Sequence, residues 1–275
     1  MITYIPDGTQ EQAAISRTTH LAISAHQDDI EFMAYAPIAE CFGNQDKWFG
    51  AIVVTDGAGS PRSGLYADYT DEQMKEVRIV EQKKAAAIGE YGFLAMLGHP
   101  SKAVKDAGNT EIFEELAGLI RKAKPKYLYT HNLADKHETH VATALKVIAA
   151  LRALPPEERP EKVYGCEVWR DLDWMNDDEK VYLDCGAHPN IMRALSAVFD
   201  SQIAGGKRYD LAAEGRRLAN ATFSASHACD TYSALNYAMN LTPLMDKKVD
   251  IGDYIAGFID RFKAQVRETI GKFLE

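Results

Sequence analysis

The chain has 275 residues, 46% of them hydrophobic and 26% charged, which is a composition typical of globular proteins. No apolar run approaches the roughly 20 residues that a membrane-spanning helix needs, and the first residues lack the basic start and apolar core of a secretory signal. The net charge of −9, without basic clusters, argues against a nucleic-acid partner. We therefore expect a cytoplasmic protein without a membrane span.

The first half of the chain alternates short β-rich runs with longer amphipathic segments. Strands are predicted at 21–25, 49–55, 92–97 and 126–130, and helices at 30–42, 71–90, 110–124 and 139–153. Alternation of this kind predicts an α/β fold, in which a Rossmann-like, mostly parallel sheet carries helices on both faces.

The pattern becomes looser beyond Pro155 and Pro156. Two further strands are predicted within 162–172 and 180–186, and helices at about 189–203, 208–226 and 253–274. We find no internal repeat and no low-complexity linker. We therefore expect a single domain over residues 1–275, with a core at about 18–205 and a C-terminal helical elaboration at about 206–275.

Polar side chains gather where three of the predicted strands end. The first strand runs into His26, Asp28 and Asp29, the second into residues 55–59, and the fourth into His131, Asn132, Asp135, His137 and His140. In open α/β sheets, ligands bind outside the carboxyl ends of the parallel strands. We therefore expect these three loops to converge at one edge of the sheet.

The residue types at this edge suit a metal ion. His26 and Asp29, three residues apart at a strand-to-helix turn, can present a nitrogen and an oxygen to one point. His140 would complete a set of two histidines and one carboxylate, which is common at catalytic zinc and iron(II) sites. Asp28, next to a ligand, would then be free to act as a general base toward water activated by the metal.

Each motif alone also has a simpler explanation. The sequence HETH at 137–140 could merely begin a helix, adjacent aspartates often mark a turn or an N-cap, and DGAGS at 56–60 could be a turn or a phosphate-binding nest. Their combination at converging strand ends favours a metal site. A dinucleotide-binding fold is disfavoured, because no glycine lies between residues 9 and 42 to let the backbone approach a pyrophosphate.

Two segments carry a resemblance to a known family. The sequence AHQDDIE at 25–31 resembles the A-H-P-D-D-x-E signature of the PIG-L/LmbE-like zinc-dependent N-deacetylases. The sequence HNLADKHETH at 131–140 resembles the H-N-x-x-D-x-H-x-x-H segment of that family. Gln27 stands where the family usually has proline, and Glu138 and Thr139 stand where many members have Pro-Asp, so hydrogen bonding around the last histidine could differ.

Weaker similarities extend this match over about residues 20–203. The sequence at 53–60 is similar to the second-strand loop of the family, and that at 77–89 to its R-x-x-E helix. The segment 190–203 is similar to a helix that ends in Ser-Gln in many members. The resemblance implies a Rossmann-like fold that binds no nucleotide.

The resemblance also implies roles for individual residues. It implies that His26, Asp29 and His140 bind one zinc ion, and that Asp28 is the general base. His137 would stabilise the oxyanion or protonate the leaving amine, and Arg78 would grip substrate hydroxyls. The family removes acetyl groups from N-acetylglucosamine units of larger conjugates, and metal-bound water attacks the amide.

The sequence therefore predicts a metal-dependent N-deacetylase acting on a small amino-sugar conjugate. Two alternatives stay open: a non-catalytic sugar-binding or regulatory module on the same fold, and an Fe2+-dependent variant of the hydrolase. A homo-oligomer is also possible.

Other residues are weaker candidates for the pocket. Four histidines and two tryptophans could line it: His99, His131, His188, His227, Trp169 and Trp174. We expect His131 to orient its loop. The tryptophans could form a wall for stacking a sugar ring, although ordinary packing is the simpler explanation.

Overall fold

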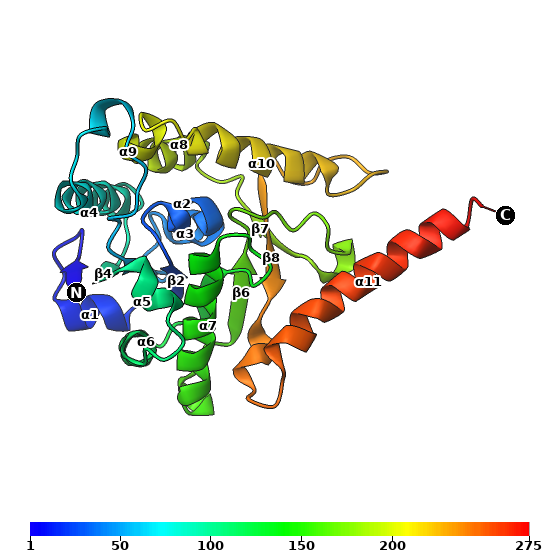
Figure 1. The fold of residues 1–275 in the computed structure, drawn as a ribbon, viewed down its shortest axis with the longest axis horizontal. Helices are drawn as coiled ribbons and strands as arrows, with labels where there is room; N and C mark the ends of the chain where they lie inside the picture. Colours follow the sequence, from blue (N-terminus) through cyan, green and yellow to red (C-terminus); the bar gives the residue numbers. More distant parts are fainter. Residues whose placement is uncertain (275) are drawn as a thin grey trace.

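Apolar runs of the first half of the chain form the centre of an eight-stranded sheet (Figure 1). The computed structural model describes residues 1–274. Its strands are β1 (Ile2–Tyr4), β2 (His20–Ser24), β3 (Phe49–Thr55), β4 (Phe93–His99), β5 (Tyr127–His131), β6 (Lys162–Cys166), β7 (Val181–Asp184) and β8 (Leu235–Asn240). The predicted α/β fold with a mostly parallel sheet is confirmed.

The strands lie in the order β1-β4-β3-β2-β5-β6-β8-β7. The parallel strands that follow β2 along the chain are added first on one side of it and then on the other. From β2 the chain moves outward through β3 and β4, and it then returns to pair β5 and β6 on the other side of β2. All of these neighbouring pairs are parallel. Ligands of open α/β sheets bind where the strand order reverses in this way, which here is between β2 and β5.

The C-terminal region is not only helical, which corrects the prediction for residues 206–275. Strand β8 lies between β6 and β7 and pairs antiparallel with both. The strand is short, with Asn236 and Asn240 interrupting its apolar residues, so it gives little local signal. Its place in the sheet is set by pairing with distant segments, which the local pattern does not encode.

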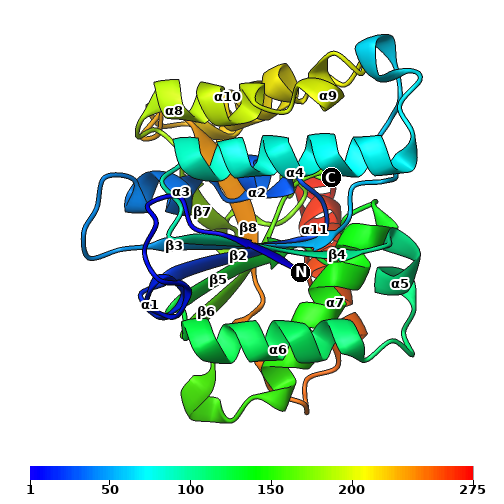
Figure 2. The same cartoon turned by 90° about the vertical axis from the view of Figure 1, so that its left-hand side faces the viewer.

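Helices cover both faces of the sheet (Figure 2). They are α1 (Glu11–Ser16), α2 (Asp29–Met33), α3 (Tyr35–Cys41), α4 (Asp71–Ile88), α5 (Ser101–Lys105), α6 (Glu111–Ala123), α7 (Glu138–Ala153), α8 (Pro189–Ala197), α9 (Asp200–Ile203), α10 (Tyr209–Phe223) and α11 (Ile251–Gly271). Alternate strand residues face opposite sides. Leu21 and Ile23 of β2 join the core under α6 and α7, and Ala22 joins the core under α2, α3 and α4.

One helix predicted at 30–42 is divided into α2 and α3. Pro37 has no N–H group, and its ring would clash with the carbonyl of Met33 in a continuous helix. The chain leaves the helical conformation at Ala34, where φ is −122° and ψ is 31°. The short helix α2 that remains carries Asp29 at its first position and is buried throughout.

The helix predicted at 189–203 is also divided, into α8 and α9. The break falls at Phe199, which has a φ of −85° and a ψ of 62° and is fully buried. Its ring lies 5.4 Å from the guanidinium carbon of Arg78. The short helix α9 then directs Ser201 onto Glu81 of α4.

Helix α11 projects from the body, and its outer end carries the C-terminus (Figure 1). Only Ile255 and Phe258 of this helix are buried. In the part of the chain that the structure describes, no helix has the length and apolar character needed to cross a membrane.

Candidate active site

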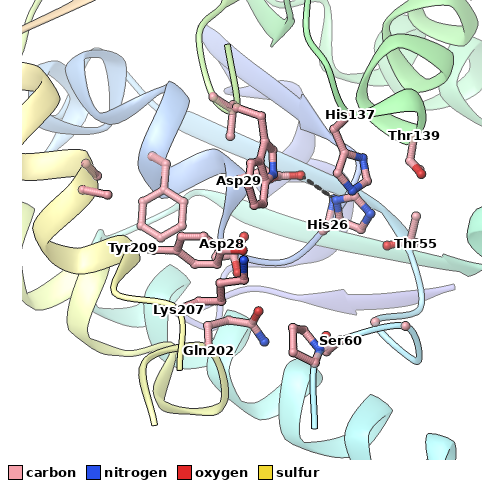
Figure 3. A pocket seen from close by; sticks show the side chains of 18 of the residues that line it. His26, Asp28, Asp29, Thr55, Ser60, His137, Thr139, Gln202, Lys207 and Tyr209 are labelled. Atoms are coloured by element: carbon pink, nitrogen blue, oxygen red, sulfur yellow. Dashed lines mark hydrogen bonds and ion pairs between the residues drawn. The ribbon is translucent and has the colours of Figure 1, made fainter. Parts of the chain in front are cut away.

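A cavity of 660 Å³ opens where β2, β3 and β5 end (Figure 3). The loop after β2 contributes His26, Asp28 and Asp29 to its lining. The loop after β3 contributes Ser60, and the loop after β5 contributes His137. The three loops therefore meet at one edge of the sheet, as their place after parallel strands predicted.

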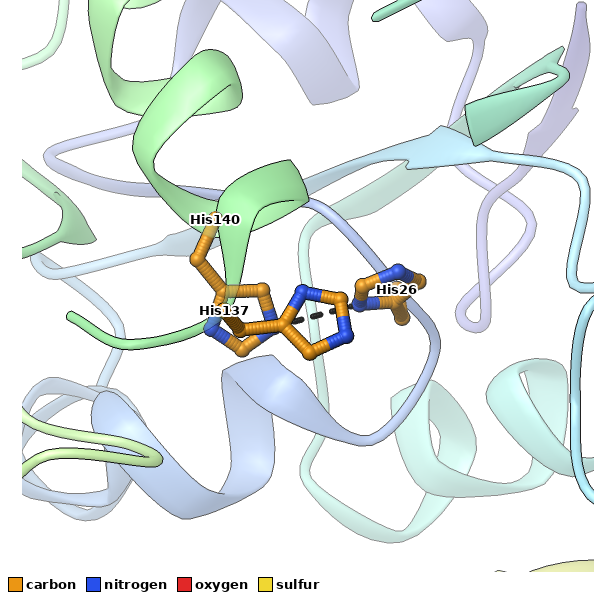
Figure 4. A group of neighbouring side chains, drawn as sticks. All are labelled: His26, His137 and His140. Atoms are coloured by element: carbon orange, nitrogen blue, oxygen red, sulfur yellow. Dashed lines mark hydrogen bonds between the residues drawn. The ribbon is translucent and has the colours of Figure 1, made fainter. Parts of the chain in front are cut away.

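Three potential metal ligands converge beside this cavity. His26 Nδ1 lies 3.2 Å from Asp29 Oδ2 and 3.2 Å from His140 Nε2, and His140 Nε2 lies 3.3 Å from Asp29 Oδ1 (Figure 4 shows the histidines). Ligand atoms about 2.0–2.1 Å from a tetrahedral ion are about 3.3 Å apart. The observed spacing therefore fits one divalent metal ion held by these residues.

Two further histidines lie close enough to compete as ligands, His131 and His137. His131 Nε2 accepts a hydrogen bond of 2.8 Å from the Ala25 N–H, so its lone pair is already used. Its ring stacks under that of His140 with a centroid distance of 3.9 Å. His131 thus supports the ring of His140, and His137 lines the cavity beside it.

The ligand cluster is strongly coupled electrostatically. Burial acts to raise the pKa of Asp29, but His140, His131 and His26 outweigh it and hold that pKa well below its usual value. Burial acts to lower the pKa of His140, but Asp29 and Asp135 outweigh it and raise that pKa to about 9. A metal ion binding at His140 would therefore replace a proton.

Asp135 organises the loop between β5 and α7. Its Oδ2 lies 3.4 Å from His140 Nδ1 and accepts a 3.1 Å hydrogen bond from the Trp169 N–H. Its Oδ1 accepts a 2.9 Å hydrogen bond from the His137 N–H. Carboxylates in this position orient metal-binding histidines. Asp135 belongs to the second motif, but we predicted no role for it from the sequence. Its position five residues before His140 could have indicated that it orients this histidine.

Asp28 occupies a strained position at the turn between β2 and α2. Its φ of 82° lies in the left-handed region, which costs a residue other than glycine on the order of 1–3 kcal/mol. The Asp28 N–H donates to Gln82 Oε1 at 3.1 Å, and Gln27 Nε2 donates to the Thr55 carbonyl at 3.1 Å. These bonds hold the turn. Gly57 lies close against it, because a Cβ at this position would be only 2.8 Å from Gln27 Oε1.

Arg78 lies under the cavity floor and is only 1% exposed. Its Nη2 donates to Asp28 Oδ2 at 2.7 Å and to the Gln27 carbonyl at 2.5 Å. Its Nη1 donates to Glu81 Oε2 at 2.8 Å and to Ser201 Oγ at 3.2 Å. These partners are protein groups, one of which is the candidate base. Because Arg78 also lines the cavity, its contact with substrate hydroxyls stays a prediction.

The environment of Asp28 suits a proton acceptor. Burial raises the pKa of Asp28 to about 6, against the opposing charge of Arg78, and the neighbouring Asp29 adds to the increase. Near pH 7 the carboxylate is therefore mostly ionised, yet basic enough to receive a proton. Because Arg78 holds Oδ2, Oδ1 is the oxygen left for another partner.

Aromatic side chains form one wall of the cavity beside His137. Trp169 lies 6.1 Å from His137 in a near-parallel arrangement and meets Tyr209 edge-on at 5.9 Å. Trp174 instead packs against Phe262 of α11. The two candidate tryptophans thus differ, since only Trp169 lines the cavity.

The remaining candidate histidines are not part of the cavity. Among the described residues, His99, His188 and His227 lie outside its lining, and His99 pairs with Glu115 at 2.6 Å.

Glu31, the last residue of the first motif, is fully buried beneath the site. Its Oε1 accepts hydrogen bonds from the Tyr91 hydroxyl at 2.7 Å and from Gln82 Nε2 at 2.8 Å. Its Oε2 has no partner among the described residues. Burial raises the pKa of Glu31 to about 7, so the folded state favours the protonated acid.

The substitution Glu31→Gln is therefore expected to stabilise the protein only at higher pH. The unfolded carboxyl ionises near pH 4.5, so the stability contributed by Glu31 is complete below that pH and is lost as the pH rises through about 7. Relative to pH 4.5, the variant should gain about 3 kcal/mol in the free energy of unfolding at pH 8.5. Urea unfolding with a chelator present measures this, with the exposed Glu114→Gln as control. An equal effect of Glu31→Gln at both pH values would contradict it.

The chain is similar to known proteins in sequence and in structure. The family model described as GlcNAc-PI de-N-acetylase (PIG-L) matches residues 21–151. No curated protein matches the chain. The fold is similar to that of GalB, the 4-carboxy-2-hydroxymuconate hydratase from Pseudomonas putida KT2440, with a TM-score of 0.62, 17% identity, and coverage of 85% of this chain and 100% of that chain.

Two deacetylases are similar in fold as well. The N,N'-diacetylchitobiose deacetylase from Pyrococcus horikoshii has a TM-score of 0.59 and 13% identity, covering 80% of this chain and 83% of that chain. The zinc-inhibited form of the teicoplanin deacetylase Orf2 has a TM-score of 0.55 and 14% identity, covering 84% of this chain and 100% of that chain. At these identities the likenesses establish the shared fold.

Proposed function

Residues 21–151 of this chain are a domain of the PIG-L family, an enzyme family of the de-N-acetylase type, and on that premise we propose a divalent-metal-dependent N-deacetylase. Its substrate is an N-acetylglucosamine-type conjugate, from which it removes the acetyl or another acyl group. The observation that carries the proposal is the convergence of His26, Asp29 and His140 within 3.3 Å, next to Asp28 and His137.

The metal would be held by His26, Asp29 and His140. A divalent ion there would supply Lewis acidity toward the amide carbonyl and would lower the pKa of water. Zinc is our first choice, because two histidines and one carboxylate are typical of catalytic zinc sites, and Fe2+ suits the same ligands. Asp135 keeps the His140 ring in orientation through its contact with Nδ1.

Asp28 acts as the general base of this proposal. Arg78 fixes Oδ2, so Oδ1 removes a proton from the attacking water, and the pKa of about 6 makes this transfer efficient near neutral pH. The same carboxyl group then delivers the proton to the nitrogen of the leaving amine. Cleavage of the C–N bond by water yields acetate and a free amine, so all atoms are accounted for.

His137 stabilises the oxygen of the amide as negative charge develops on it. Burial, together with His140 and His26, lowers the pKa of His137 to about 4, so the ring is neutral at pH 7. A neutral imidazole donates through its N–H group but is a poor proton donor to an amine. The lowered pKa of His137 therefore favours stabilisation of the oxyanion over protonation of the leaving amine.

Acetate release from a panel of N-acetylglucosaminyl conjugates and other acylated amines, with and without a chelator, tests the function. We expect activity on at least one conjugate, loss of activity with the chelator, and recovery on adding one equivalent of metal. Zn2+ and anaerobic Fe2+ are compared at that stoichiometry, because the Orf2 neighbour was captured in a zinc-inhibited form. Binding without release of acetate from any conjugate would favour the non-catalytic alternative.

Hydration of a carbon–carbon double bond in an unsaturated carboxylate is a second candidate. It would use the same metal and Asp28 to activate water. The lysines at the cavity mouth, Lys136 and Lys207, favour it because they would attract a carboxylate, and one fold neighbour is a hydratase. Loss of absorbance from a conjugated unsaturated acid, without amine release, would distinguish hydration from deacetylation.

A further inference from the structure

Cationic side chains gather at the mouth of the cavity. Lys136 comes from the loop between β5 and α7, Lys207 from the connection between α9 and α10, and Arg216 from α10. In the described part of the chain, no carboxylate oxygen lies within 4.0 Å of their charged nitrogens. This is notable in a chain whose net charge is −9.

Two other lysines have carboxylate partners. Lys75 lies 3.4 Å from Asp56, and Lys105 lies 3.6 Å from Glu138, so each has a carboxylate partner on a neighbouring element. Among the described residues, Lys136, Lys207 and Arg216 have no such partner.

Lys207 is held in place by the backbone of its connection. A Cβ on Gly205 would lie 2.2 Å from the Ser201 carbonyl oxygen, so only glycine fits there. The Lys207 N–H donates to the Gln202 carbonyl at 2.9 Å. Its Nζ lies 5.4 Å from the centre of the Trp169 ring, and Figure 3 shows the side chain entering the cavity between Gln202 and Tyr209.

The acidic residues of the cavity do not neutralise these lysines. Asp28 and Asp29 belong to the catalytic and metal-binding group at the floor. The third acid, Glu167, is buried and accepts hydrogen bonds from the N–H groups of Leu172 and Tyr237 at 3.2 and 3.0 Å. Its charge partly balances that of Arg216. Lys136 and Lys207 are left as the free cations of the mouth.

We propose that the mouth binds an anionic oxygen group, a carboxylate or a phosphate, carried by the substrate on the side away from the amide. The inference rests on the proposed function, because it states where the part of the conjugate that extends outward from the metal centre binds. Lys136 and Lys207 would make charge-assisted hydrogen bonds to that group. Trp169 would pack against the intervening sugar ring.

Matched conjugates of N-acetylglucosamine test this inference: the neutral methyl glycoside, the carboxymethyl glycoside and the 1-phosphate. We expect kcat/KM to be at least about tenfold higher for one or both anions than for the methyl glycoside. The double variant Lys136→Gln/Lys207→Gln should reduce this preference to about twofold or less. Lys122→Gln, an exposed lysine of α6, should leave the preference unchanged. The two anions distinguish carboxylate from phosphate recognition.

Calorimetry on Asp28→Asn with the same compounds separates this inference from the proposed function. Suppose that the wild type cleaves no conjugate, but that Asp28→Asn binds an anionic conjugate more tightly than the methyl glycoside and loses this preference when both lysines are replaced. The proposed function is then wrong and the anion site stands. If all three conjugates are cleaved equally, or if the preference survives in the double lysine variant, the anion site is wrong and the function stands.

Discussion

Replacing Asp28 with asparagine is expected to lower kcat about 10²–10⁴-fold while the protein keeps its metal. Asparagine retains an oxygen that can accept from Arg78 Nη2, which lies 2.7 Å from Asp28 Oδ2. Asparagine is also well tolerated at the positive φ of 82° found at this position. Fold and ligand geometry should therefore persist, and only the basic oxygen is lost. Acetate release and metal content, measured on the same preparation, check this result.

Asp56→Asn is the matched control for Asp28→Asn. Asp56 follows the neighbouring strand β3 and pairs with Lys75, and it lies outside the cavity lining. We expect its substitution to change kcat by less than about threefold, as for most surface substitutions. If Asp28→Asn turns over at the wild-type rate with full metal content, Asp28 is not the base.

Replacing His140 with glutamine is expected to abolish both metal binding and turnover. The His140 Nε2 atom lies 3.2 Å from His26 Nδ1 and 3.3 Å from Asp29 Oδ1, so its loss removes one of three converging ligands. We expect less than about 0.1 metal ion per chain and a loss of kcat greater than about 10³-fold, because the proposed metal would supply most of the electrostatic stabilisation. Elemental analysis and acetate release measure the two effects.

Thermal stability gives an independent view of the same substitution. A metal present at about 100 times its dissociation constant would stabilise the wild type by about 2.7 kcal/mol, whereas His140→Gln should gain nothing from added metal. His99→Gln serves as control, since His99 ends β4 and pairs with Glu115 away from the cavity. One metal ion per chain in His140→Gln would instead point to a ligand set that includes His137.

The centre of the fold and the convergence of the candidate metal ligands could be predicted from sequence because both follow local patterns. Strands β2, β3, β4 and β5 are apolar runs separated by helical periodicity. Parallel pairing of such strands brings the residues that follow them to one edge. His26, Asp29 and His140 meet for this reason, although 114 positions separate the two histidines.

The features that were not predicted depend on contacts between distant segments. The partners of Arg78 include Ser201, 123 positions away, so its burial could not be derived from α4 alone. The similarity of 77–89 and 190–203 to two family segments was the available hint that these regions meet. Lys136 and Lys207 gave no sequence signal, because single surface lysines are common.

The contact between Ser201 of α9 and Arg78 has a consequence for how the proposed function is distributed along the chain. Every proposed metal ligand lies between His26 and His140, whereas the support of Asp28 runs through Arg78 to Ser201. On the proposed assignment, the metal ligands would lie within residues 26–140, whereas turnover would also depend on Ser201. A substitution at Ser201 can weaken catalysis in a protein that still titrates with one equivalent of metal, so metal content alone is a poor assay for an active preparation.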